Sequence, residues 1–170
     1  MNKPPIIRSI SWLAVLFQLA LIGVFAVVIA LVFRVRDPIM AIFFGALIHS
    51  AFCRLAGAIL SPDHRRGIAL FRAKKFSEAA PRFEASYAAF NCRPWIDRFR
   101  WITLGSASSM SYREMALCNA AFCYGQVGDG TRATALYEQA LREFPESSLA
   151  AASLNMLRSV QSPNATTGNG

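Results

Sequence analysis

Four serines near the middle of the chain are the first candidates for chemistry. They are Ser106, Ser108, Ser109 and Ser111. A serine acts as a nucleophile when its turn exposes the hydroxyl beside a base, as in the GxSxG elbow. The chain has no such motif, and His64 is its one histidine outside the apolar segments. Serines in this pattern are more typical of caps and turns, and we expect those roles here.

The four cysteines form no CxxC pair. Cys118 and Cys123 are five residues apart, which is about 140° around a helix, so the two thiols face different directions and make no zinc pair. Neither GxGxxG nor a P-loop sequence occurs. We therefore expect no catalytic residue, no cofactor and no metal site. We interpret the chain as a non-enzyme of a reducing compartment.

The two histidines have different surroundings. His49 lies within an apolar segment, where a proton relay or a metal ligand is one interpretation. We favour a helix-end or interhelical hydrogen bond, because no residue of matching chemistry accompanies it. His64 adjoins Arg65 and Arg66, and we expect these three residues to form a solvated basic stretch that faces lipid headgroups.

Two long apolar segments, residues 10–33 and 38–60, make up most of the N-terminal part of the chain. Residues 10–33 contain only Ser11 and Gln18 as polar residues and are long enough to span a bilayer, so residues 1–9 are predicted to be an N-terminal tail. Residues 38–60 begin after a proline break and are interrupted by polar residues, so they form either a second span or an interfacial helix. A buried soluble helix or a cleaved signal peptide fits residues 10–33 less well. The sequence thus predicts a transmembrane helix hairpin.

The net charge of +8 is unevenly distributed. Residues 1–60 carry +4, residues 61–100 carry +5 and residues 101–170 carry −1. Positive charge next to apolar segments favours membrane lipids as partners of the basic juxtamembrane stretch, and we expect no nucleic acid. The largest basic group follows the second apolar segment, which predicts a cytoplasmic C-terminal part.

One spacing of residues occurs twice in the C-terminal part. Gly67 and Ala121 each precede a small residue by twelve positions, an aromatic residue by sixteen and another small residue by nineteen. Such self-similarity indicates a repeat of paired helices, in which small residues allow close approach. Unit 114–147 closely resembles the tetratricopeptide repeat; unit 67–90 resembles it less well, since Pro81 falls within its second helix. The segment SYREMALCNAAFCYGQVG also resembles bacterial membrane-anchored tetratricopeptide-repeat proteins of unassigned function, which implies a bacterial inner membrane.

The resemblance implies a concave binding face on the first helix of each repeat. The residues that it places there are Phe71, Arg72, Lys75, Met115, Cys118, Asn119, Phe122 and Gln126. Asn119 matches an asparagine that holds a peptide carboxylate in some members of the family. Ile68 stands where a second asparagine would be needed, so we do not expect that clamp.

An insert at residues 91–111 separates the two repeats. Residues 94–104 are predicted to form an amphipathic helix, because Trp95, Phe99 and Ile102 share one helical face. Three interpretations remain open: the insert completes the core of the repeats, lies on the membrane surface, or binds a partner through Trp95 and Phe99. Ser111 and Glu114 form a capping box for the helix that follows.

The prediction is an all-α protein with a transmembrane helix hairpin and a short tetratricopeptide-like stack. The stack covers residues 61–160, its terminal helix runs from 147 to 160, and 161–170 form a disordered tail. The expected function is a membrane-anchored scaffold that binds a cytoplasmic protein or peptide. The alternative is a small subunit of an envelope transport or assembly complex, in which the hairpin is the working part. The oligomeric state stays open.

Overall fold

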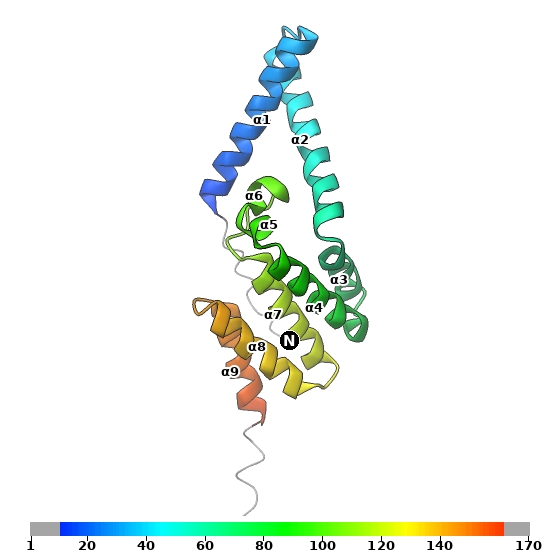
Figure 1. The fold of residues 1–170 in the computed structure, drawn as a ribbon, viewed down its shortest axis with the longest axis vertical. Coiled ribbons are helices and arrows are strands. Elements are labelled where there is room, and N and C mark those ends of the chain that lie inside the picture. Colours follow the sequence, from blue (N-terminus) through cyan, green and yellow to red (C-terminus); the bar gives the residue numbers. More distant parts are fainter. Residues whose placement is uncertain (1–10, 162–170) are drawn as a thin grey trace, which may run out of the picture. The chain divides into compact units, whose positions relative to one another are not determined.

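The computed structural model describes residues 11–161, so the predicted tail 1–9 and all but the first residue of the predicted tail 161–170 lie outside this range. Nine helices and no extended strand occur within the described range (Figure 1). This confirms the predicted class, an apolar helix pair followed by a helical domain. The chain divides into two compact units. The first contains the residues up to Ser61 together with 94–111, and the second contains 62–93 and the residues from Tyr112 onward.

Helices α1 (Trp12–Phe33) and α2 (Pro38–Leu60) form the hairpin of the first unit. The hydroxyl of Ser11 accepts a hydrogen bond from the amide of Ala14 and starts α1, and the carboxylate of Asp37 accepts one from the amide of Ile39 and starts α2. Arg34 adopts a left-handed conformation with φ of 52° and ends α1. The four residues between the helices therefore reverse the chain.

The hairpin closes on small residues. A Cβ atom on Gly45 would lie 2.8 Å from the backbone nitrogen of Ala26, so α1 and α2 are in backbone contact there. Ala41, Gly45 and His49 follow each other at i, i+4 spacing and form the buried stripe of α2. Gly23 and Gly57 have nothing within 4 Å of such a Cβ atom, so the close approach depends on Gly45.

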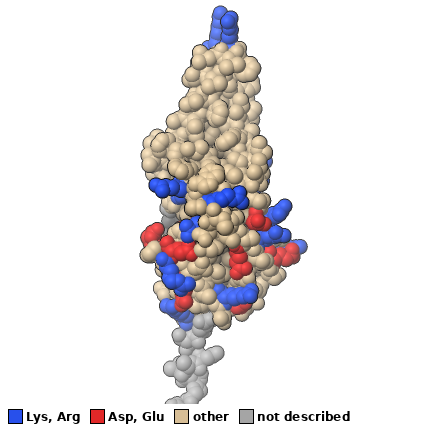
Figure 2. Space-filling view, in the orientation of Figure 1, with Lys and Arg blue, Asp and Glu red and all other residues tan. Residues whose placement is uncertain are grey.

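Both hairpin helices are long and apolar enough to cross a membrane, by length and composition. At a rise of about 1.5 Å per residue each extends for about 33 Å, the scale of a bilayer core. Most of their large apolar side chains are exposed, as lipid contact would require. Figure 2 shows basic atoms at the hairpin turn and an uncharged surface along the visible face of the two helices. Helix α2 also continues unbroken through Arg54 to Leu60.

The second unit is a stack in which each helix packs on the next along the chain. Its members are α3 (Pro62–Arg72), α4 (Phe76–Cys92), α7 (Tyr112–Gln126), α8 (Gly130–Glu143) and α9 (Ser148–Gln161). Ring contacts at both ends fix the direction of its helices: Phe76 meets Phe122, whereas Phe90 meets Tyr112, so α4 and α7 are antiparallel.

Alanine and glycine make close packing possible in this unit. Ala79, Ala121, Ala133 and Ala140 are each fully inaccessible. A Cβ atom on Gly67 would lie 2.9 Å from the Phe83 ring, so this ring occupies the space that the missing side chain leaves. The small and aromatic positions of the repeated spacing are thus core positions, as the sequence predicted.

Local signals set the turns of the stack. Gly128 has a φ of 86° and ends α7, and the carboxylate of Asp129 accepts a hydrogen bond from the amide of Arg132 at 3.0 Å to start α8. The Ser147 hydroxyl accepts one from the amide of Ala150 at 3.3 Å and so starts α9. Helix α9 ends at Gln161, one residue later than predicted. Pro81 lies inside α4 without ending it.

The insert differs from its prediction in two respects. It forms two short helices, α5 (Pro94–Arg98) and α6 (Arg100–Thr103), which are broken at Phe99. Side chains take backbone carbonyls that a continuous helix would use: Thr103 Oγ1 donates to the carbonyl of Ile96, and Arg100 Nη1 donates to that of Asp97. The prediction of one continuous amphipathic helix over residues 94–104 is therefore wrong, and the buried apolar side chain of α5 is Ile96, whereas Trp95 and Phe99 are exposed.

The second difference is the domain to which the insert belongs. The sequence placed it within the 61–160 domain, whereas residues 94–111 pack with the hairpin. The cause is a set of contacts with the hairpin that are distant in sequence. The ring of Trp101 stacks on that of Phe17 with centroids 4.5 Å apart, and the carbonyl of Ala107 accepts a hydrogen bond from the amide of Ser11 at 2.9 Å.

Candidate functional site: an aromatic patch with a basic rim

Three phenylalanines from three helices of the second unit meet to form what we call the aromatic patch. Phe71 of α3, Phe76 of α4 and Phe122 of α7 have ring centroids 5.3 to 6.0 Å apart. Phe71 and Phe76 are half-buried, and Phe122 is 38% exposed. Tilted and edge-on packing of this kind fixes the rings while leaving apolar surface open to a partner.

Basic residues lie next to the aromatic patch in sequence, at the last residue of α3 and in the turn that leads to α4. Arg72, Lys74 and Lys75 are all exposed, and we call them the basic rim. Lys74 has a left-handed backbone with φ of 58°, which makes this turn tight. Lys75 lies 3.4 Å from Glu78, an exposed pair that contributes little to stability. The rim therefore presents positive charge beside an apolar surface.

The other predicted partner-binding residues of α7 lie on the same helical stripe as Phe122. Met115, Asn119, Phe122 and Gln126 follow at i, i+4, i+7 and i+11, and all four are at least partly accessible. Cys118 does not belong with them. It is only 3% exposed and packs in the core beside α8 and α9, so its assignment to a binding face is wrong.

Trp95 and Phe99 lie in the other unit. Both are exposed, by 52% and 45%, on the insert. The predicted set of binding residues is therefore divided: Phe71, Arg72, Lys75 and the α7 residues share one unit, and the two aromatic residues of the insert belong with the hairpin.

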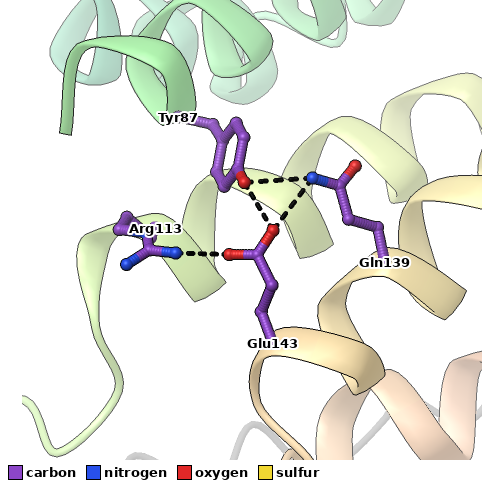
Figure 3. A network of polar contacts seen from close by, with 4 residues as sticks. All are labelled: Tyr87, Arg113, Gln139 and Glu143. Atoms are coloured by element: carbon purple, nitrogen blue, oxygen red, sulfur yellow. Dashed lines mark hydrogen bonds and ion pairs between the residues drawn. The ribbon is translucent and has the colours of Figure 1, made fainter. Parts of the chain in front are cut away.

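A polar network that the sequence did not indicate joins α4, α7 and α8 (Figure 3). The Tyr87 hydroxyl donates a hydrogen bond to Glu143, and Arg113 forms an ion pair with the other carboxylate oxygen of Glu143. Gln139 Nε2 lies 3.0 Å from both the Tyr87 hydroxyl and the Glu143 carboxylate. The members come from positions up to 56 residues apart, so no local pattern could have revealed them.

Burial and hydrogen bonding shift the pKa values within this network in opposite directions. Burial, and then the hydrogen bond to Glu143, raise the pKa of Tyr87. Burial alone would raise the pKa of Glu143, but hydrogen bonds from Tyr87, Gln139 and Arg113 outweigh it and lower that pKa. Glu143 is therefore charged and Tyr87 neutral at pH 7, and the network ties three helices together without a group poised for proton transfer.

His64 is a core residue, which corrects its assignment to a solvated basic stretch. It is 7% exposed, and its ring packs edge-on against Phe83, Phe90 and Tyr112. Its Nδ1 lies 3.1 Å from the Ser86 hydroxyl. Burial lowers the pKa of His64 to about 4, so the ring is neutral at pH 7. Because α3 starts at Pro62, His64 lies on the face of this helix that packs in the core, whereas Arg65 and Arg66 are exposed.

Cys118 and Cys123 are core residues, and Ser106 and Ser108 lie in turns. Cys118 and Cys123 pack in different core clusters, and burial raises their pKa values to about 12 and about 11, so both thiols stay protonated. The hydroxyls of Ser106 and Ser108 accept hydrogen bonds from backbone amides two residues later. Within residues 11–161, no group of three or more histidine, cysteine and carboxylate side chains could hold a metal ion.

His49 is buried within the hairpin and has a neighbour of related chemistry one turn away. Its Nε2 lies 3.6 Å from the Cys53 sulfur, across i, i+4 of α2. Its Nδ1 and the Nε2 of Gln18 are buried and have no hydrogen-bond partner in the described part of the chain. Unpartnered polar atoms are costly in apolar surroundings, so these two atoms distinguish the hairpin from a purely apolar helix pair.

Comparisons with protein-family models, with curated proteins and with solved structures find no match to this chain.

Proposed function

We propose that this chain is a membrane-anchored helical scaffold that binds a protein or peptide partner in the cytoplasm. The observation that carries the proposal is the aromatic patch of Phe71, Phe76 and Phe122, which leaves rings accessible where three helices meet. Fixed aromatic side chains at the surface are typical anchors of protein interfaces, because they bury much area at little cost in conformational entropy.

The basic rim defines the chemistry of the partner. Arg72, Lys74 and Lys75 favour an acidic segment, and the neighbouring rings favour one apolar side chain within it. An amphipathic helix or an extended peptide with carboxylates beside a leucine or an aromatic residue meets both requirements.

The architecture of the second unit supports a tetratricopeptide-like assignment. Its helices pack in chain order, and the small residues that the motif requires are buried. The aromatic patch includes one residue from each first helix, Phe71 of α3 and Phe122 of α7, which is where members of that family bind peptides. The conserved carboxylate clamp of some members is not part of the proposal.

The hairpin and its flanking charges support the membrane location. We assign α1 and α2 to a bacterial inner membrane, with the second unit in the cytoplasm, because the largest group of basic residues follows α2. We infer a binding role rather than catalysis, since the side chains of His64, Cys118 and Cys123 are buried in the core of the second unit.

Site-specific photocrosslinking in intact cells tests the proposed site. A photoreactive phenylalanine analogue replaces Phe122 in one chain and Met156 in another. Met156 is a matched control, because it is 70% exposed on α9 of the same unit. The proposal expects a discrete protein adduct from position 122 that is absent from position 156. Equal adducts from both positions, or none from position 122, would refute it.

The second candidate, in which the hairpin is the working part of an envelope complex, rests on a separate observation. Gln18 and His49 each bury a polar atom that has no hydrogen-bond partner among residues 11–161, within a mainly apolar helix pair. Replacing residues 11–61 by an unrelated two-span anchor would abolish the activity of such a complex. The scaffold proposal instead expects activity to survive this replacement.

A further inference from the structure

The insert occupies the open end of the hairpin. Helix α6 contacts both α1 and α2 and lies between their diverging ends (Figure 1). On one side Trp101 stacks on Phe17 of α1 at an interplanar angle of 29°. On the other side Gly105 approaches Cys53 of α2 so closely that a Cβ atom at Gly105 would lie 2.5 Å from the sulfur. The insert therefore fills the space between the two helices.

The insert is held rigidly in this position by its own hydrogen bonds. Arg100 donates to the carbonyls of Asp97, Ser108 and Ser109, which ties α6 to the loop that follows it. Thr103 Oγ1 lies 2.9 Å from the carbonyl of Ile96 and holds α5 against α6. The guanidinium of Arg100 thus donates its hydrogen bonds to backbone carbonyls of the insert itself. Arg98 is exposed on α5 and lies beside the exposed Trp95 and Phe99 in sequence.

The contacts of the insert set its depth. A helix crosses a bilayer core in about 20 residues. If the core begins at the hairpin turn, next to Arg34 and Pro38, it ends near residue 14 of α1 and residue 57 of α2. Phe17 and Cys53 lie about one turn inside these limits, and any tilt of the helices takes them deeper. The part of the insert that contacts them is therefore at the boundary between hydrocarbon and headgroups.

We infer that the insert is an interfacial wedge, which seats between the two spans and places Trp95 and Phe99 in the headgroup region of the bilayer. Tryptophan favours this region because its ring is apolar and its N–H is polar. Arg98 meets the phosphates of anionic lipids there. The partner of this surface is lipid, and a protein that covers Trp95 is the competing outcome. The inference rests on the part of the proposed function that places the hairpin across a membrane.

Fluorescence quenching in vesicles measures this depth. The full chain carries three tryptophans, and the variant Trp12→Phe/Trp101→Phe leaves Trp95 alone while keeping an aromatic ring against Phe17. It is reconstituted into vesicles of phosphatidylcholine and phosphatidylglycerol in equal parts. Quenchers are lipids brominated near the headgroup end of the chain, lipids brominated near the chain terminus, and iodide in the buffer. Trp95 is expected to lose most of its emission to the shallow bromines and little to iodide.

Two reference chains make the outcomes distinguishable. Each has all three tryptophans replaced by phenylalanine and one new tryptophan, at Val24→Trp in mid-span or at Met156→Trp in the second unit. Quenching of Trp95 by iodide, with Val24→Trp quenched by the deep bromines, would overturn the wedge and leave the membrane anchor intact. A Val24→Trp chain that neither bromolipid quenches would overturn the anchor and the wedge together.

Discussion

Titration of His64 makes the stability of the second unit depend on pH. Its pKa falls from 6.5 to about 4 on folding, so the unfolded chain binds a proton between these values that the folded chain does not. We predict that the free energy of unfolding is unaffected by His64 above about pH 6.5 and falls by up to about 1.4 kcal/mol per pH unit from there down to about pH 4.

The measurement is the urea concentration at the midpoint of unfolding of the full chain in mild detergent. Unfolding is monitored by the near-ultraviolet circular dichroism of tyrosine. All four tyrosines lie in the second unit and all three tryptophans in the first, so the two units can be followed separately. The control is His64→Phe, which keeps a ring among Phe83, Phe90 and Tyr112 and removes the titration. Equal pH slopes for the two chains would show that His64 is not the cause.

The basic rim yields a second prediction at the scale of single residues. Arg72→Glu/Lys74→Glu should reduce the yield of the adduct formed from position 122, because the reversed charges repel an acidic partner. Arg142→Glu on α8 is the control, since it also reverses an exposed positive charge in the same unit. The loss should diminish at high salt, which screens exposed charges. An unchanged adduct yield would mean that the partner is not acidic.

Gly45 determines how closely the two hairpin helices can pack. Gly45→Leu forces side-chain atoms into the backbone of α1 at Ile22 and Ala26, which cannot move aside as a side chain would. We expect a loss of about 1–3 kcal/mol in hairpin stability, the usual range for overpacking. Thermal unfolding of the full chain in detergent, monitored by tryptophan fluorescence, measures this loss of stability. Gly23→Leu is the control because it has open space around it, and an equal loss from it would contradict the role of Gly45.

Gly105 tests whether the insert is seated against α2. Gly105 has a left-handed φ of 60°, and a Cβ atom at this position would also clash with Cys53. Gly128 has a left-handed φ as well, but a Cβ atom there would meet nothing within 4 Å, so Gly128→Ala is the matched control for Gly105→Ala. In a Cys92→Ser background, we predict that Gly105→Ala speeds the reaction of Cys53 with a membrane-permeant maleimide and that Gly128→Ala does not. The thiols of Cys118 and Cys123 are buried and give little background. Equal rates in both variants would mean that the insert does not cover Cys53.

The elements with local signals were predictable from the sequence. Asp37 and Pro38 start α2 at the expected residue, and the sequence around Gly128 and Asp129 marks the turn between α7 and α8. The aromatic patch was partly predictable, because Phe71 and Phe122 lie on first helices of the repeated spacing. Phe76 was not among the predicted binding residues, because it lies outside the first helix of its repeat and only the packing of α4 on α7 brings its ring to Phe122.

The features that depend on distant contacts were not predictable. The insert belongs with the hairpin because Trp101 stacks on Phe17, which precedes it by 84 positions. The network of Tyr87 and Glu143 likewise depends on how α4 and α8 pack together. His64 was misassigned because its neighbours Arg65 and Arg66 are exposed, and only the true start of α3 reveals that position 64 faces inward.

At the scale of the whole molecule, the chain combines two units with different surfaces. The first exposes apolar side chains along most of α1 and α2, and the second exposes mixed charges around the aromatic patch. The proposed partner binding and the proposed membrane anchoring therefore use separate residues.

Crosslinking in intact cells, followed by membrane purification and mass spectrometry, tests the central claim most directly. It compares the wild-type chain with Phe71→Ala/Phe122→Ala and with a chain whose residues 11–61 are replaced by an unrelated two-span anchor that has both of its ends on the cytoplasmic side. The scaffold account predicts one abundant protein partner that is kept after the anchor replacement and lost from the double alanine variant. A partner that persists in the double variant and disappears with the hairpin would contradict the account and place the function in the membrane.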